Sequence, residues 1–277
     1  MAPLLQVERL DVTFEGGRAP VRAVRGVSFT LGRERLGIVG ESGSGKSTTG
    51  KALLGLLPRS ARVEAQRMRF DDHDLLRLSA RGWRELRGRR ISMILQDPKF
   101  SLNPMIRVGK QIMETLRLHK AVSGAEARRQ ALAMLEAVRM RDPERVFELH
   151  PHQLSGGMGQ RVMIAAMLIA GPDLLIADEP TSALDVTVQN QVLRILDDLV
   201  SARGMGLVFI SHNLTAIASF CDRVLVMYEG RILEELPARE LWRARHPYTR
   251  ALIAAAPDLD RPKPELAVVA RDPEWAR

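Results

Sequence analysis

The sequence predicts an α/β protein built on a mostly parallel sheet, with an inserted helical portion and antiparallel strands at its start. From Leu174 onward, short apolar strands alternate with helical segments, which is the pattern of parallel strands joined by helical crossovers. Between residues 108 and 138 the apolar residues recur at helical spacing, so this middle portion is expected to be helical. Segments 4–14 and 23–31 alternate loosely between apolar and polar residues, which is typical of strands.

The remaining elements follow from local signals along the chain. A strand at 35–39 leads into a glycine-rich turn, and the helix expected over 47–57 is ended by Pro58. Ser123 and Glu126 have the spacing of a capping box, which predicts a helix that begins after Ser123. Further short strands are expected at 91–95, 174–178 and 207–211, further helices at 186–201 and 214–220, and a weakly structured tail from Arg261.

The composition is that of a folded protein. Of its 277 residues, 45% are hydrophobic and 27% charged. The single cysteine, Cys221, excludes a disulfide framework and any metal site built on several thiolates, and it favours a reducing compartment. No apolar run approaches the roughly 18 residues of a membrane span. Glu8 and Asp11 interrupt the N-terminal region, so no secretory signal is expected.

The formal net charge is +8 and is carried mostly by arginine. This charge permits an anionic partner such as nucleic acid or lipid headgroups. Only 4% of the residues are aromatic, which is little material for stacking on bases. We therefore favour a solvated basic face over a nucleic-acid footprint, including at the densest cluster, Arg81, Arg84, Arg87, Arg89 and Arg90.

Residues 40–47, GESGSGKS, match the phosphate-binding pattern GxxxxGK[ST] between a predicted strand and a predicted helix. The glycines let backbone N–H groups point at phosphate oxygens, next to the positive end of the following helix. Lys46 is expected to neutralise the β- and γ-phosphates of a nucleotide, and the Ser47 hydroxyl to bind Mg²⁺. The motif predicts a P-loop NTPase but by itself does not distinguish kinases, GTPases, motors and transport ATPases. The residues expected to bind the nucleotide are Gly40, Ser42, Gly43, Ser44, Gly45, Lys46, Ser47 and Thr48.

A second predicted strand ends in two acids, Asp178 and Glu179. A buried strand that delivers carboxylates to a phosphate site has this pattern. Asp178 is expected to bind Mg²⁺, and Glu179 is expected to polarise the water that attacks the γ-phosphate.

A third motif, Leu154-Ser155-Gly156-Gly157, begins an apolar helix upstream of the acid pair. Ser155 and the two glycine amides form an anion-binding helix N-terminus that has no lysine of its own. Together the three motifs resemble those of the ATP-binding-cassette (ABC) ATPases, and the third, residues 154–157, resembles the signature of that family. The resemblance covers about residues 4–236.

The resemblance implies roles for four further residues. Gln96 corresponds to the Q-loop glutamine that senses Mg²⁺ and the membrane partner. Asp185, in SALD, corresponds to the D-loop that crosses the dimer interface. His212 corresponds to the switch histidine that contacts the γ-phosphate, and Phe14 is the candidate for stacking on adenine.

The phrases QDPKFSLNP, DEPTSALDVTVQNQVL and HPYTR resemble the ATPase subunits of dipeptide, oligopeptide and nickel importers. Two features depart from that family. Cys221 stands alone and outside the C-terminal extension, so the iron–sulfur cluster of many relatives is excluded. Gly159 occupies a signature position where relatives usually have a basic residue.

The resemblance implies a P-loop NTPase fold with a RecA-like core, in a nucleotide-binding domain over residues 1–260 that has a helical subdomain at about 97–160. It also implies a C-terminal extension at 237–277. The implied activity is hydrolysis of ATP with Mg²⁺ at the cytoplasmic face of the inner membrane. The implied partners are a second ATPase subunit, identical or not, and two permease subunits that work with an external substrate-binding protein. The alternative, a soluble ABC ATPase that acts on nucleic acid or the ribosome, is disfavoured by the single cassette and its short insertion. The cargo, peptide or nickel, is not indicated because the ATPase never touches it.

Overall fold

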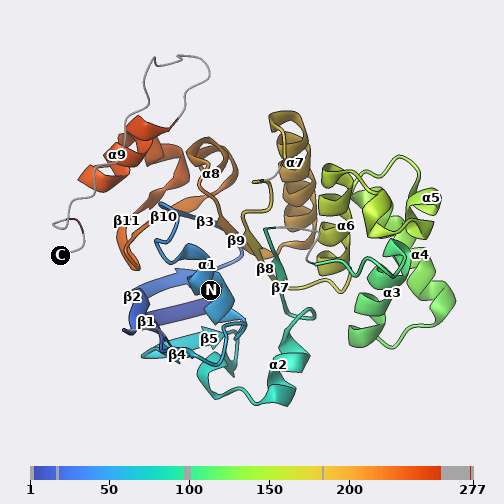
Figure 1. Ribbon diagram of the computed structural model, residues 1–277, viewed down its shortest axis with the longest axis horizontal. Coiled ribbons are helices and arrows are strands. Elements are labelled where there is room, and N and C mark those ends of the chain that lie inside the picture. Colours follow the sequence, from blue (N-terminus) through green and yellow to red (C-terminus); the bar gives the residue numbers. More distant parts are fainter. Residues whose placement is uncertain (1–2, 17–18, 97–100, 183, 257–274, 276–277) are drawn as a thin grey trace. The chain divides into compact units, whose positions relative to one another are not determined.

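The computed structural model describes residues 3–16, 19–96, 101–182, 184–256 and 275. The chain divides into two compact units, which are described separately. Unit 1 comprises residues 1–79 and 208–277, and unit 2 comprises residues 80–207. Figure 1 shows the helices and strands of each unit.

Unit 1 begins with an antiparallel sheet of five strands (Figure 1). Its strand order is β2-β1-β5-β6, and β4 also pairs with β1. Alternate side chains, among them Leu5, Leu10 and Phe70, are fully buried on one face, as expected of a half-buried sheet. The predicted flanking antiparallel strands are therefore confirmed: β1 Leu5–Phe14, β2 Val21–Leu31, β4 Ala61–Glu64, β5 Arg67–Phe70 and β6 His73–Asp74.

The second group of strands in unit 1 leads into residues 40–47, which are called the phosphate loop here after the role that the sequence predicts. Strands β11 (Arg231–Pro237), β10 (Arg223–Tyr228), β3 (Arg35–Val39) and β9 (Gly206–Ile210) are neighbours in that order, and the chain passes from unit 2 to unit 1 within β9. Strands β3 and β10 are parallel, whereas β10 and β11 are antiparallel. The α/β class and the parallel strand pairing predicted from the sequence are confirmed. The helices of this unit are α1 Lys46–Leu53, α8 Leu214–Phe220 and α9 Pro247–Ala255, with a 3₁₀ segment at Ala238–Arg243.

Helix α1 ends before the predicted boundary at Pro58. Its last helical residue is Leu53, and Gly55 has a φ of +59°. The amides of Gly55 and Leu56 donate to the carbonyls of Ala52 and Lys51, at 3.0 and 2.9 Å. This is a Schellman motif, in which a left-handed glycine closes the helix, so Gly55 ends α1 and Pro58 does not.

Unit 2 combines a parallel strand pair with a group of helices (Figure 1). Strands β7 (Ile91–Ile94) and β8 (Leu174–Asp178) are parallel neighbours, and both are fully buried. Strands that are buried along their whole length are typical of a sheet covered on both faces. The helices are α2 Ala80–Leu86, α3 Val108–His119, α4 Gly124–Ala137, α5 Pro143–Glu148, α6 Gly156–Leu168 and α7 Val186–Arg203.

The helical character predicted for residues 108–138 is confirmed by α3 and α4. At the start of α4, the Ser123 hydroxyl accepts from the Glu126 amide at 3.2 Å, as expected. The Glu126 carboxylate instead accepts hydrogen bonds from Arg129 and Gln130, so the glutamate half of the predicted capping box does not form. An arginine one turn ahead offers a charged donor, and the carboxylate binds it in preference to a neutral amide.

Candidate functional site

The phosphate loop lies between β3 and α1, and its glycines are required by close backbone packing. A Cβ atom on Gly40 would lie 2.1 Å from the Met227 carbonyl oxygen, and one on Gly45 would lie 2.5 Å from the Ala23 carbonyl oxygen. Both residues have positive φ angles, +152° and +99°. Gly43, with φ +83°, has no atom within 4 Å of the corresponding position. The loop is therefore packed against the rest of unit 1 at Gly40 and Gly45 and is open at Gly43.

The side chain of Lys46 lies inside this loop and is only 6% exposed. Its ammonium donates to the carbonyls of Gly40 and Glu41, at 2.8 and 2.7 Å, and to the Ser44 hydroxyl at 3.3 Å. Burying a cation is tolerated where acceptors surround it. Lys46 therefore places a positive charge beside the first residues of α1, whose N-terminus carries the positive end of the helix dipole.

Two further predicted residues lie in unit 1. His212 is exposed and follows Ser211, whose amide donates to the Ile38 carbonyl of β3 at 3.2 Å. This bond places the residue before His212 against the strand that leads into the phosphate loop. Phe14 is half-buried at the end of β1, where it pairs with Val21 and Ala61.

The acid pair lies at the carboxyl end of β8 in unit 2. Asp178 is buried, with 5% exposure, and Glu179 has a φ of +50°. A left-handed conformation costs a non-glycine residue about 1–2 kcal/mol. The amide and the hydroxyl of Ser182 both donate to the Glu179 carbonyl, at 3.3 and 3.2 Å, and support this turn. Gln96 is exposed just after β7, the parallel neighbour of β8, so it lies at the same end of the strand pair as Asp178.

The signature residues form the start of α6. Ser155 is its N-cap, and the serine hydroxyl accepts from the Met158 amide at 3.3 Å. A Cβ atom on Gly157 would lie 2.6 Å from Cγ1 of Val188, so this glycine allows α6 to approach the start of α7. Asp185 caps α7 by accepting from the Val188 amide at 3.0 Å. The structure thus brings the signature and the D-loop aspartate together within unit 2.

The predicted site residues divide between the two units. Those in unit 1 are Phe14, Gly40, Ser42, Gly43, Ser44, Gly45, Lys46, Ser47, Thr48 and His212, and those in unit 2 are Gln96, Leu154, Ser155, Gly156, Gly157, Asp178, Glu179 and Asp185. Within unit 2 the structure places Gln96 and Asp178 at the same end of the strand pair and the signature beside the start of the helix that Asp185 caps.

Comparison with known proteins decides the family. The sequence model of the family described as "ABC transporter" matches residues 24–182. This chain belongs to the ABC transporter family.

Curated relatives of this ABC ATPase extend the likeness over nearly the whole chain. A probable peptide ABC transporter ATP-binding protein, y4tR of Sinorhizobium fredii, is 50% identical over 93% of this chain and 78% of the relative. The oligopeptide transport ATP-binding protein OppD of Salmonella typhimurium is 47% identical over 98% of this chain and 81% of the relative's length. The DppD dipeptide transport ATP-binding protein of Escherichia coli is 44% identical over 95% and 81%.

Solved structures agree on the fold. One of them is the dimeric structure of a post-hydrolysis state of the ATP-binding cassette MJ0796 bound to ADP and Pi. Its TM-score with this chain is 0.76, and the two sequences are 27% identical. The match covers 85% of this chain and 99% of that one. The P-loop NTPase fold and the ATP-hydrolysing character predicted for the ABC ATPase are therefore confirmed.

One support of the phosphate loop in this ABC ATPase lies outside the motifs that predict the site. The Tyr248 hydroxyl, in α9, accepts a hydrogen bond from the Glu41 amide at 3.0 Å. Tyr248 belongs to the HPYTR segment, which indicates the importer family in the sequence but was assigned no role at the site. The signal in the sequence was a tyrosine directly after the proline that begins a helix. That signal does not identify the partner, which lies 207 residues away.

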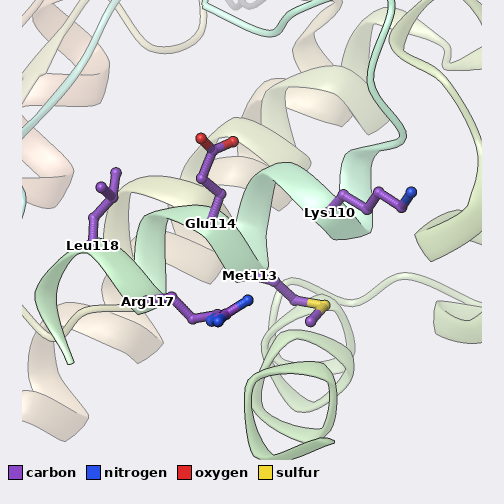
Figure 2. A pocket seen from close by; sticks show the side chains of 5 residues that line it. All are labelled: Lys110, Met113, Glu114, Arg117 and Leu118. Atoms are coloured by element: carbon purple, nitrogen blue, oxygen red, sulfur yellow. The ribbon is translucent and has the colours of Figure 1, made fainter. Parts of the chain in front are cut away.

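Unit 2 also has an open groove of about 530 Å³ along α3. Figure 2 shows five side chains that line it, all from that helix: Lys110, Met113, Glu114, Arg117 and Leu118. None of these five is a predicted site residue of the ABC ATPase. Leu118 is 74% exposed.

Two absences hold within the part of the chain that the structure describes. No helix there combines the length and apolar character that crossing a membrane requires. Over the same residues, no three His, Cys, Asp or Glu side chains gather in the way a protein-only metal site would need.

Proposed function

We propose that this ABC ATPase binds MgATP at residues 40–48 and energises a bacterial importer of dipeptides or oligopeptides. The observation that carries the proposal is the buried Lys46 ammonium, held by three acceptors of a glycine loop that is open at Gly43. Peptides are preferred to nickel as the cargo because the relatives described above are named for peptide transport. None of the comparisons favours the nucleic-acid alternative.

Nucleotide binding is assigned to the loop and to α1. The loop amides and the helix N-terminus would bind phosphate oxygens, while Lys46 would neutralise the β- and γ-phosphates. Phe14 would stack on the adenine. Ser47, Asp178 and Gln96 offer hydroxyl, carboxylate and amide oxygens, the hard donors that suit Mg²⁺. When bound there, Mg²⁺ would neutralise charge on the β- and γ-phosphates.

Hydrolysis is assigned to Glu179 and His212. Glu179 would orient and polarise the attacking water, and His212 would contact the γ-phosphate. The left-handed turn at Glu179 supports this role, because strained backbone conformations concentrate at functional sites. The catalytic contribution of these residues is then positioning and charge stabilisation.

The signature is proposed to act on ATP held by a second ATPase subunit. Ser155 and Gly156 are exposed at the start of a 13-residue helix, which suits a group that meets a ligand carried by another chain. Asp185 would lie at the same interface, together with Leu154 and Gly157. The two ATPase subunits are proposed to bind two permeases at the cytoplasmic face of the inner membrane, served by an external peptide-binding protein.

The test uses the complex purified from membranes through a tag on this chain. Permease subunits should copurify with it. In that complex, Glu179→Gln should reduce ATP turnover more than about tenfold, which corresponds to about 1.4 kcal/mol of barrier. ATP affinity should stay within about twofold of wild type, because the substitution removes a carboxylate needed only for hydrolysis.

The matched control is Glu85→Gln, which makes the same chemical change on an exposed side chain of unit 2. It should leave turnover within about twofold of wild type. A Glu179→Gln complex that keeps turnover within tenfold contradicts the assignment of Glu179. A tagged chain that brings no permease out of the membrane contradicts the proposed transporter assembly.

A further inference from the structure

The C-terminal helix α9 reaches the phosphate loop through one buried side chain. Tyr248 is fully buried, and its hydroxyl accepts from the Glu41 amide at 3.0 Å. Its ring packs against that of Tyr228, the last residue of β10, with the centroids 4.5 Å apart and the planes tilted by 47°. These contacts lie entirely within unit 1, and the phosphate chemistry described above makes no use of Tyr248.

A single peptide group connects Tyr248 with Lys46. The N–H of the peptide between Gly40 and Glu41 donates to the Tyr248 hydroxyl. The C=O of that same peptide accepts from the Lys46 ammonium at 2.8 Å. Hydrogen bonds at the two ends of one amide polarise each other, so each strengthens the other. Removing the Tyr248 hydroxyl therefore weakens the hold of the peptide that locates the Lys46 charge.

The start of α9 is itself fixed to β11 by one carboxylate. Glu234 accepts from the amide of Arg245 at 2.8 Å and from the hydroxyl of Thr249 at 2.6 Å. The His246 ring then caps the helix by accepting from the Tyr248 amide at 3.2 Å. Because these bonds immobilise the first turn of α9, the Tyr248 hydroxyl is presented to the loop in one place, with little conformational freedom left to lose.

We propose that Tyr248 is a positioning residue for Lys46, through which helix α9 of the C-terminal extension sets the affinity of the phosphate loop for MgATP. The inference rests on the proposed role of Lys46 in nucleotide binding. It differs from a purely structural role for Tyr248, because it requires the hydroxyl and not only the buried ring.

The test compares Tyr248→Phe with wild type in the complex assembled with its permeases. The proposal places this bond in both the substrate-bound state and the transition state, so its loss should raise KM for ATP about fivefold and leave kcat within about twofold. The variant keeps the ring. ATP hydrolysis is measured well below the midpoint of thermal unfolding of each sample, so that every chain is folded.

The matched control is Tyr228→Phe, which deletes the same atom from the neighbouring ring of the pair. It should leave KM for ATP within about twofold of wild type. A wild-type KM in Tyr248→Phe would overturn the inference. An increase of equal size in Tyr228→Phe would also overturn it, because the effect would then come from general loosening of the ring pair.

Lys46→Ala separates this inference from the site on which it depends. If Lys46→Ala abolishes ATP binding while Tyr248→Phe has a wild-type KM, the phosphate site stands and only the positioning role is wrong. If the Lys46→Ala chain binds ATP with wild-type affinity, the proposed phosphate site is wrong and the inference is overturned with it.

Discussion

Substitution of Gly45 by alanine should destabilise this ABC ATPase far more than the same change at Gly26. Both glycines belong to unit 1 and have positive φ angles, +99° and +67°. Alanine in a left-handed conformation costs about 1–2 kcal/mol at either position. A Cβ on Gly26 would meet nothing within 4 Å, whereas one on Gly45 would lie 2.5 Å from the Ala23 carbonyl oxygen.

The obstacle at Gly45 is backbone that has little freedom to move. Ala23 belongs to β2, and the neighbouring Gly230 is tied on both sides. Its amide donates to the Ser44 carbonyl at 3.0 Å, and its carbonyl accepts from the Arg25 amide at 2.8 Å. Forcing extra volume into such a place costs about 1–3 kcal/mol. The two contributions give a loss of about 3 kcal/mol for Gly45→Ala and about 1 kcal/mol for Gly26→Ala.

Urea denaturation of the full chain, followed by tryptophan fluorescence, measures both free energies of unfolding. The difference between the two variants should be about 2 kcal/mol. If Gly45→Ala proves no more destabilising than Gly26→Ala, the close packing of the loop against β2 is refuted, because the backbone conformation alone would account for both losses.

Two further predictions follow from other parts of the molecule. Burial alone would raise the pKa of Glu234, but hydrogen bonds from Thr249 and from two backbone amides at the start of α9 lower it below its ordinary value. The contribution of Glu234 to the stability of the fold is therefore complete above about pH 4.3, the ordinary pKa of a glutamate, and is lost as the pH falls through the lowered pKa. Between about pH 6 and pH 3, wild type should therefore lose more unfolding free energy than Glu234→Gln. Equal losses would contradict this prediction. Mixing Ser155→Arg chains with Lys46→Ala chains should restore part of the ATP hydrolysis that each variant lacks, because a mixed dimer has one intact shared site. If a verified mixed dimer shows no recovery, sharing of the site between copies of this chain is contradicted.

The phosphate loop and the acid pair could be located from the sequence because the proposed ligand dictates their residue types. Phosphate oxygens need backbone amides, a cation and room for close approach, and these needs appear in the sequence as a glycine-rich run ending in Lys46. Asp178 could be placed for a similar reason, because it ends an apolar run that has to be buried. The boundary of α1 could not be placed from Pro58, because two hydrogen bonds at Gly55 close the helix earlier.

The supports of the site were harder to predict because their residue types are not dictated by the ligand. The Met227 contact with Gly40 uses a backbone carbonyl, which any residue would supply. Every residue of strand β11 is half-buried or exposed, so its sequence lacks a clear alternation of buried and exposed positions. Tyr248 acts on an amide 207 residues away, and no local pattern encodes such a pairing. What decides these contacts is the packing of distant strands and helices.

The two proposed anion-binding motifs of this ABC ATPase differ in the charge that each offers, and this difference explains why mixing the variants is informative. The loop at Lys46 holds a full positive charge, positioned by three acceptors inside its own unit. The helix start at Ser155 offers a hydroxyl, backbone amides and a dipole equivalent to about half an elementary charge, an effect that fades within the first turn. A full charge attracts a nucleotide without help, whereas a partial charge contributes only when a phosphate is brought against it. We therefore assign nucleotide capture to Lys46 and completion of the hydrolytic site to a partner's signature, so a defect in either motif should be complemented by an intact copy on the other chain.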